Sequence, residues 1–177
     1  MKNLNLAEFA GGVGHPNHEH SFRALSADDC AELCGFYRDL GFEARHSRFG
    51  AALSDQALAD HCRRLDWRRA IMIACVSDQR FAAVLEIHQV GASWQCCEIV
   101  LACRLGAEAT IIVAQLLQLA AFAAGKLGCR AFVVPLDRSG RAMFPFLEGM
   151  GATRLDGDQA VIELGDYGGP RRRPAAA

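Results

Sequence analysis

The spacing of hydrophobic and polar positions predicts short, regular elements over the first part of the chain. A strand is expected over 22–25, and Ser26 with Asp29 three residues later marks the start of the following helix. The stretch 41–53 shows no such periodicity and is rich in arginine, so we expect it to be irregular. A second helix is expected over 54–65.

Three long apolar runs follow, and each is typical of a buried strand. They span 70–76, 81–90 and 94–104. The first two are separated by Ser77-Asp-Gln-Arg80, a composition that favours a hairpin turn, and a second turn is expected at 91–93. The sequence therefore predicts a meander of three antiparallel strands.

The longest apolar segment, 110–127, is predicted to be a helix buried on more than one side and ended by Gly128. The next run, 130–136, is predicted to be a strand, and Pro135 near its end favours an exposed or splayed edge there. The last regular segments are a helix and a hairpin, expected over 139–150 and 153–164.

Composition narrows the class of protein. The chain has 177 residues, of which 51% are hydrophobic and 22% charged, as expected for one globular domain over 21–166. The glycine- and histidine-rich residues 1–20 are expected to be a flexible arm, and 167–177 a disordered tail. A formal net charge of -1 favours neither nucleic acid nor an anionic membrane as a partner.

Two further features bear on the compartment. No apolar run of about 18 residues is free of charge and glycine, so no transmembrane helix is expected, and the first residues lack the apolar core of a signal peptide. Most of the 8 cysteines lie inside apolar segments, as in proteins of a reducing cytosol, so a cytoplasmic protein is predicted.

The order of elements and several short motifs resemble the GNAT acetyltransferases over about residues 22–164. Glu98-Ile-Val-Leu-Ala-Cys is similar to the fourth strand of that family, which often begins with a glutamate. Arg45-His-Ser-Arg48-Phe49 is similar to a turn of the bacterial protein-lysine acetyltransferase branch. The other matching segments are Phe22-Arg-Ala-Leu with Asp28-Asp29, Leu116-Leu117, Gly128, and the run from Arg141-Ala-Met143 to Gly151-Ala152.

This resemblance implies an α+β fold with a mixed, mostly antiparallel sheet of about six or seven strands and about four helices. It implies an acyl-CoA-dependent N-acyltransferase whose acceptor is a small-molecule amine or a protein lysine, with Glu98 as the base. The pantetheine arm of acetyl-CoA or another acyl-CoA would bind main-chain groups at Val100, Leu101, Ala102 and Cys103. The remaining implied cofactor-binding residues are Glu108, Ala109, Thr110, Ile111 and Ser139.

The phosphate-binding loop departs from the family's pattern, which has the form Gln/Arg-x-x-Gly-x-Gly/Ala. An ungapped match places Glu108, Ile111 and Val113 on its three defining positions. Glycines let phosphates approach a helix N-terminus, whereas branched side chains crowd it and Glu108 adds negative charge. Losing two or three charge-assisted hydrogen bonds, at about 1.5–3 kcal/mol each, would remove most of the cofactor affinity.

Two interpretations of this loop follow. In one, Thr110 caps a core helix and residues 111–113 are packing residues. The protein would then be a catalytically silent GNAT-fold module that binds a ligand or another protein in a regulatory role. In the other, an acyltransferase keeps a weakened phosphate site. Fold alone does not choose between them.

Titratable residues inside apolar strands are the other candidates for chemistry. Glu98 lies in such a strand, where burial would raise its pKa toward the range of a general base; the alternative is a carboxylate paired with an arginine. Glu86 and His88 are two residues apart and face the same side of a strand. They could form a relay, or His88 could be a partly buried, hydrogen-bonded histidine.

Three further groups are weaker candidates. Arg45 and Arg48 could contact an acidic substrate or partner, with structural ion pairs to Asp39, Asp55 or Glu43 as the alternative. The arm contains His15, His18, Glu19 and His20, which suit a transition metal but lack outer-shell partners, so no metal site is predicted. Cys96 and Cys97 are expected to be inert packing residues. An apolar surplus makes a homodimer plausible.

Overall fold

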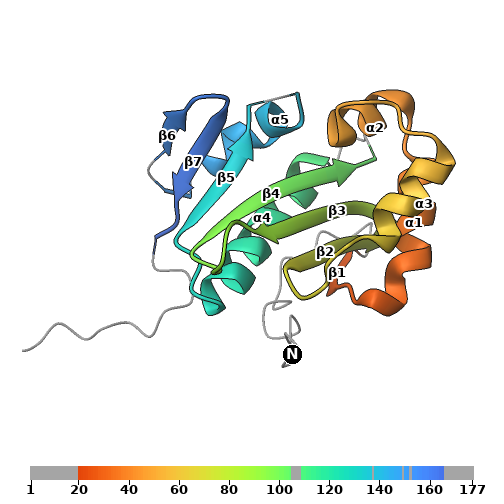
Figure 1. Cartoon of the computed structure of the whole chain (residues 1–177), viewed down its shortest axis with the longest axis horizontal. Coiled ribbons are helices and arrows are strands. Elements are labelled where there is room, and N and C mark those ends of the chain that lie inside the picture. The colour runs from red at the N-terminus through yellow and green to blue at the C-terminus, as the bar shows by residue number, and fades with distance from the viewer. Residues whose placement is uncertain (1–19, 105–108, 137, 149, 152, 166–177) are drawn as a thin grey trace, which may run out of the picture.

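The computed structural model describes residues 20–104, 109–136, 138–148, 150–151 and 153–165, apart from the side chains of 138–142. The predicted arm, except His20, and the predicted tail lie outside these residues, as does Glu108. Within them, the chain forms one seven-stranded sheet flanked by five α-helices and one 3-10 turn (Figure 1).

The sheet has the order β1-β2-β3-β4-β5-β7-β6. Neighbouring strands are antiparallel except for β4 and β5, which run parallel. The mixed, mostly antiparallel sheet predicted from the sequence is therefore confirmed. The strands are β1 (Ser21–Ala24), β2 (Ala70–Ser77), β3 (Arg80–Gln89), β4 (Cys96–Cys103), β5 (Ala131–Pro135), β6 (Thr153–Asp156) and β7 (Gln159–Glu163).

Local sequence signals mark the start of the first helical segment and the end of the longest helix. Ser26 and Asp29 form a reciprocal capping box at the 3-10 turn η2 (Ala27–Asp29), which leads into the first helix. Gly128, with φ of 90°, follows the longest helix and adopts the left-handed conformation that favours glycine. The helices are α1 (Cys30–Asp39), α2 (Phe42–Phe49), α3 (Asp55–Arg63), α4 (Ala109–Lys126) and α5 (Arg138–Leu147).

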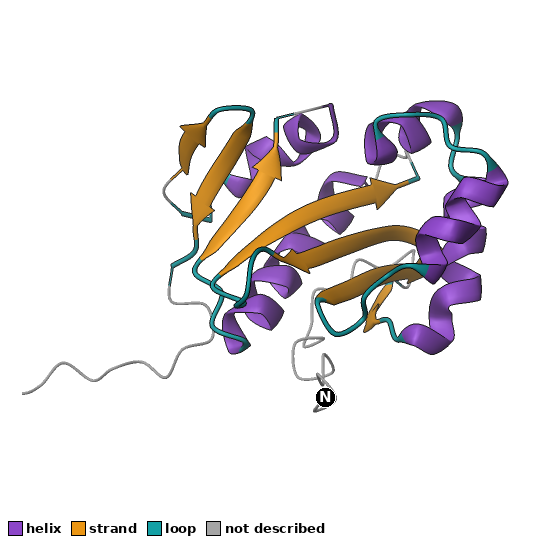
Figure 2. Ribbon diagram, in the orientation of Figure 1, coloured by secondary structure: helices purple, strands orange, loops and turns teal. Residues whose placement is uncertain are grey.

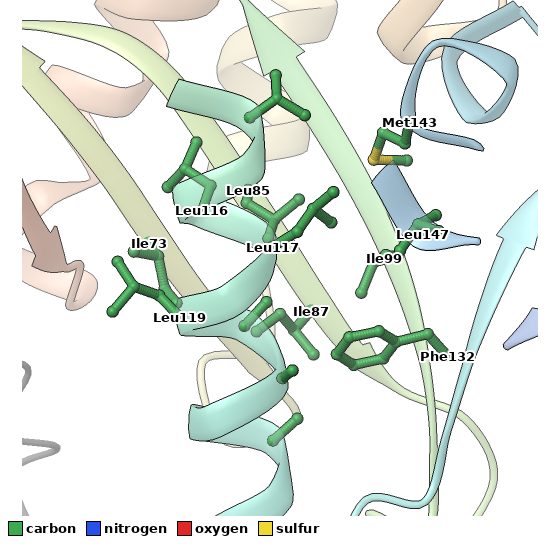
Figure 3. Packing of buried hydrophobic residues seen from close by; sticks show 14 of the residues in the cluster. Ile73, Leu85, Ile87, Ile99, Leu116, Leu117, Leu119, Phe132, Met143 and Leu147 are labelled. Carbon is green, nitrogen blue, oxygen red and sulfur yellow. The ribbon is translucent and has the colours of Figure 1, made fainter. Parts of the chain in front are cut away.

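Both faces of the sheet are covered by helices (Figure 2). One face packs against α4 and α5: Ile73, Leu85 and Ile87 lie beside Leu116 and Leu117 of α4, as Figure 3 shows. The opposite face, over β2 to β4, packs against α1 and α3 through a second apolar cluster that includes Leu33, Phe36, Leu58, Met72 and Val84. The sheet is thus the middle layer of three.

The helix α4 is the longest and most apolar helix among the described residues. By length and composition alone it could cross a membrane, but the core helix of a soluble protein passes the same test. Nine of its residues are buried, and they belong to the cluster shared with the sheet. The prediction of a helix buried on more than one side is therefore confirmed.

The segment expected to be irregular contains a helix, so that prediction is wrong for α2. None of the residues of α2 is fully buried, which is why its hydrophobic pattern gives no periodic signal. Polar side chains attach it instead: Arg45 donates to the main-chain carbonyls of Leu40 and Arg38, at 2.9 and 2.6 Å. Those carbonyls belong to the end of α1, where an arginine offsets unpaired acceptors.

Gly151 is expected to tolerate no side chain. A Cβ atom built at this position lies 1.7 Å from the main-chain oxygen of Glu163 and 2.9 Å from its carbonyl carbon. Since backbone must move to relieve that contact, we predict that Gly151→Ala lowers the free energy of unfolding by about 1–3 kcal/mol. Chemical denaturation followed by circular dichroism measures the change.

The matched control is Gly35→Ala. Gly35 lies inside α1, and a Cβ there meets nothing within 4 Å. Alanine in a helix interior is favoured over glycine by about 0.5–1 kcal/mol, so this variant should be as stable as the wild type or more so. Equal stability of the two variants would contradict the close contact at Gly151.

Candidate active site

The parallel strands β4 and β5 pair only at their start. Their register runs Cys96 to Ala131, Cys97 to Phe132 and Glu98 to Val133, and ends there. Both strands continue beyond the last pair, but β5 stays paired with β7 and β4 with β3 (Figure 1). The sheet therefore forks, and Glu98 lies at the base of the fork. The splayed edge predicted from Pro135 is the same feature.

The fork opens toward the starts of two helices. After β4 the chain continues into α4, which begins at Ala109, and after β5 it continues into α5, which begins at Arg138. The first turn of an α-helix carries unpaired N–H groups and a partial positive charge, a combination that suits anions. The open end of the fork therefore has the backbone arrangement of an anion site.

Four of the residues predicted to bind an acyl-CoA lie along one side of this fork. Val100 to Cys103 lie in the part of β4 beyond its last pair with β5. Among the described residues, the main-chain groups of this segment that face β5 have no strand partner. The side chains of Val100 and Ala102 are buried, and those of Leu101 and Cys103 are half-buried.

The exposure of the side chains at the start of α4 differs from residue to residue. Thr110 is exposed, Ile111 is 50% exposed, and Ile112 and Val113 are buried in the core cluster. The packing interpretation therefore applies to Ile112 and Val113. Ile111 therefore presents a branched aliphatic side chain outward from the first turn, beside the exposed Thr110. Glu108 lies outside the described residues, as does the side chain of Ser139, whose backbone is in the first turn of α5.

Glu98 is half-buried in β4. It makes no side-chain hydrogen bond or ion pair with the described residues, so the alternative of an arginine-paired carboxylate does not apply to it there. Its cross-strand partner on β3 is His88, and directly opposed residues of antiparallel strands project from the same face of a sheet. Glu98 and His88 are therefore neighbours at the base of the fork.

The arginine-paired carboxylate of this site is Glu86, which is fully buried. Its Oε1 accepts hydrogen bonds from the Tyr37 hydroxyl at 2.5 Å and from Arg48 Nε at 2.7 Å, and Arg48 Nη2 lies 2.5 Å away. Its Oε2 bonds to His88 Nε2 at 2.9 Å. Three elements meet in this network, because Tyr37 comes from α1, Arg48 from α2, and Glu86 and His88 from β3.

These contacts decide the charge of each group. Burial would raise the pKa of Glu86, but the Arg48 guanidinium, with His88 and Tyr37, holds it well below its ordinary value. Burial and the adjacent Glu86 carboxylate raise the pKa of Tyr37 well above its usual range. At neutral pH the network thus contains a carboxylate, a guanidinium and a neutral phenol.

His61 of α3 lies at the side of this network. Its ring makes edge contacts with Tyr37 and Phe49, at centroid distances of 6.0 and 5.2 Å. Burial lowers the pKa of His61, and its Nε2 is buried without a hydrogen-bond partner. His61 is therefore an uncharged packing residue near the site.

The two predicted arginines have structural partners. Arg45 lies 3.7 Å from Asp55, one of the ion pairs that the sequence suggested, and Asp39 pairs with Arg104 instead. Arg48 pairs with Glu86, which the sequence did not suggest. The half-buried His88, hydrogen-bonded to Glu86, agrees with the simpler interpretation of that histidine and leaves the relay open.

Sequence reasoning missed the roles of Tyr37 and Arg48. Tyr37 is a buried residue of α1, and the contact of its hydroxyl with Glu86 has no local signal in the sequence. A signal did exist on β3, since a glutamate inside the run Val84-Leu-Glu-Ile87 must find a buried cationic partner. The sequence did not show which arginine supplies it.

Comparison with known proteins bears on the fold. No family model and no curated protein sequence matches the chain. Among solved structures, the GNAT domain of Streptomyces lividans PAT superposes with a TM-score of 0.65 at 17% identity, covering 85% of this chain and 99% of that one. The PaiA N-acetyltransferase of Thermoplasma acidophilum, solved with coenzyme A, has a TM-score of 0.57 at 16% identity, covering 82% and 98%.

A third similar structure is an aminoglycoside 6'-acetyltransferase of type Ii, with a TM-score of 0.62 at 12% identity, covering 80% of this chain and 93% of that one. These proteins share one architecture. The protein therefore has the GNAT acetyltransferase fold, as its sequence predicted. At these identities the likeness establishes the fold, and the activity has to be argued from the site.

We predict that Arg48→Met destabilises the protein by about 3–5 kcal/mol, because it leaves the Glu86 carboxylate buried without its cation. The loss should depend on pH. With Arg48 present, the lowered pKa of Glu86 means that its contribution to stability exists above the ordinary value of 4.5 and is lost as the pH falls. Without Arg48, burial raises that pKa, so the variant loses stability as the pH rises through 4.5.

Urea denaturation at pH 5 and at pH 8 measures this difference, which should be larger at pH 8. Arg63→Met is the matched control, since Arg63 is exposed and pairs with Asp60 on the surface of α3. Its effect should stay within about 0.5 kcal/mol at both pH values. A loss in Arg48→Met that does not change with pH would show that Glu86 is not the group affected.

Proposed function

We propose that the protein is an acyl-CoA-dependent N-acyltransferase whose reaction takes place at the base of the β4–β5 fork. The observation that carries the proposal is the position of Glu98, a half-buried carboxylate at the last residue pair before the two strands diverge. A carboxylate placed there lies next to main-chain groups that no strand occupies, so an extended ligand in the fork would end beside it.

The donor would bind to β4 as an additional strand does. The unpaired main-chain groups between Val100 and Cys103 suit the amides of a pantetheine arm, which alternate donors and acceptors. The diphosphate would then lie toward the N–H groups at the start of α4. A protein of the same fold has been solved with coenzyme A, which supports this class of ligand.

Ile111 would weaken that phosphate contact. Its half-exposed side chain occupies the first helical turn, where glycine would let an anion approach the backbone closely. We therefore propose a donor held mainly by its pantetheine arm.

The chemistry needs a proton acceptor for the amine. Glu98 would attract an ammonium group and accept its proton, which leaves a neutral amine to attack the thioester carbonyl carbon. A C–N bond forms and the C–S bond breaks, and the leaving thiolate takes up a proton. The acceptor would be a small-molecule amine or the side chain of a protein lysine.

A second candidate function is a GNAT-fold module that has lost acetyl-CoA and binds another ligand or a protein. The half-exposed Ile111 at the phosphate position favours it. The two functions differ in one property, which is whether acyl-CoA binds at the fork with useful affinity.

Calorimetric titration with acetyl-CoA and coenzyme A separates the two functions. The proposal expects dissociation constants in the micromolar range, and an affinity weaker than about 1 mM would overturn it in favour of the binding module. Glu98→Gln should bind both ligands as the wild type does but lose turnover about 10²–10⁴-fold, because it cannot accept a proton.

Glu163→Gln is the matched control for the carboxylate, since Glu163 is an exposed glutamate of β7 in the same sheet. It should retain both binding and turnover. Turnover that persists in Glu98→Gln would assign the proton transfer to another group.

The phosphate contact has its own test. Ile111→Ala keeps the helix but removes the branched side chain, so the affinity for acetyl-CoA should rise, by up to about tenfold, or about 1.4 kcal/mol. The affinity for acetyl-pantetheine, which has no diphosphate, should stay the same in both proteins. An equal change for both ligands would show that Ile111 does not act on the phosphates.

A further inference from the structure

A second group able to accept a proton stands next to Glu98. His88 is the cross-strand partner of Glu98 and projects from the same face of the sheet. Its side chain is 32% exposed, and its Nε2 is 2.9 Å from Glu86 Oε2. The base of the fork therefore holds one carboxylate without a partner among the described residues and one imidazole that is held in place.

The contacts of Glu86 determine which ring nitrogen of His88 carries the proton. Glu86 is ionised, because its contact with Arg48 holds its pKa well below the ordinary value despite burial. An ionised carboxylate can only accept hydrogen bonds, so Nε2 of His88 must be the donor. In the neutral ring, Nδ1 then carries the lone pair.

That lone pair is available. Among the described residues, Nδ1 of His88 has no hydrogen-bond partner and is not one of the buried, unsatisfied polar atoms. Glu86 itself cannot take the proton, since Tyr37 and Arg48 occupy its Oε1 and His88 occupies its Oε2. The network therefore fixes the imidazole and leaves one basic atom open to solvent.

We propose that His88 acts through Glu98 by carrying protons away from it. Glu86, Arg48 and Tyr37 hold the His88 ring in the required tautomer. This inference rests on the proposed acyltransfer. After Glu98 has accepted the proton of the acceptor ammonium, that proton passes to Nδ1 of His88, directly or through one water molecule. Glu98 becomes a carboxylate again, and His88 becomes an imidazolium that releases the proton to solvent.

The charges around His88 suit this role. Glu86 from its own strand and Glu98 from β4 both face it, and each would offset a positive ring. The Arg48 guanidinium of α2 opposes that effect, but it is bound to Glu86. Tyr37 of α1 and the His61 and Cys62 side chains of α3 also lie nearby. All three are uncharged at neutral pH, since burial raises the pKa of Tyr37 and of Cys62 and lowers that of His61.

The test compares turnover and binding in His88→Ala. We expect kcat to fall about 10²-fold while the affinity for coenzyme A stays at the wild-type value. The lost rate should return on addition of free imidazole and should increase with buffer concentration, because a diffusing base replaces the missing ring. A purely structural histidine would give neither rescue nor buffer dependence.

Two further variants make the result decisive. His88→Gln keeps an N–H donor for Glu86 but cannot carry a proton, so it should be as slow as His88→Ala; wild-type turnover in His88→Gln would reduce His88 to a structural role and overturn the relay. His46→Ala is the control, since His46 is an exposed histidine of α2 in ring contact with Phe42, and it should show wild-type kinetics.

The outcomes separate this inference from the proposed function. If acetyl-CoA does not bind the wild-type protein, the proposed function falls and the relay falls with it. If acetyl-CoA binds and Glu98→Gln is inactive, while His88→Ala turns over normally or is slow without rescue by imidazole, then the relay alone is overturned.

Discussion

The contact between Arg48 and the buried carboxylate of Glu86 constrains more of this molecule than any other polar interaction described above. A carboxylate in the middle of an apolar strand would be costly to ionise unless a cation and further donors surrounded it. Arg48, Tyr37 and His88 supply those donors. Because they come from α1, α2 and β3, satisfying one carboxylate also places two helices over the sheet.

That constraint explains the placement of a helix that has no fully buried residue. Two arginines attach α2 to the rest of the fold. Arg48 donates a hydrogen bond to Glu86 of β3, and Arg45 donates to a main-chain carbonyl at the end of α1. The position of α2 over the end of β4 therefore depends on charge and hydrogen bonds as well as on the partly buried Ala44 and Phe49. The same network sets the orientation of His88 at the fork, so architecture and candidate chemistry share one set of contacts.

Most of the fold could be predicted from the sequence. The three strands of the meander and α4 have strong apolar patterns, and their boundaries in the structure lie within one or two residues of the predicted ones. The turn at Asp78 and Gln79 was also predicted, and both residues have positive φ, 49° and 61°, as a type I′ hairpin turn requires. Local sequence signals are sufficient to predict an element where its buried positions recur at a regular spacing.

The candidate site was less accessible to the same reasoning. Glu98 and the edge of β4 were found through a family resemblance, and the fork appears only once β4 and β5 are paired in space. In the Glu86 network, Arg48 is 38 positions and Tyr37 is 49 positions away from Glu86 in the sequence. Nothing in the local pattern of α2 indicates these contacts. Contacts between polar residues far apart in sequence depend on how the elements pack in space, and a local hydrophobic pattern does not predict that packing.

The short parallel seam between β4 and β5 has a consequence for the order of assembly. Only three residue pairs join the two halves of the sheet there, and they bring together segments separated by the whole of α4. Hairpins such as β2–β3 and β6–β7 close short loops, whereas this seam closes a long one at a greater entropic cost. The two halves are therefore expected to form early and to dock late, so the fork between them would be among the last parts of the protein to be completed.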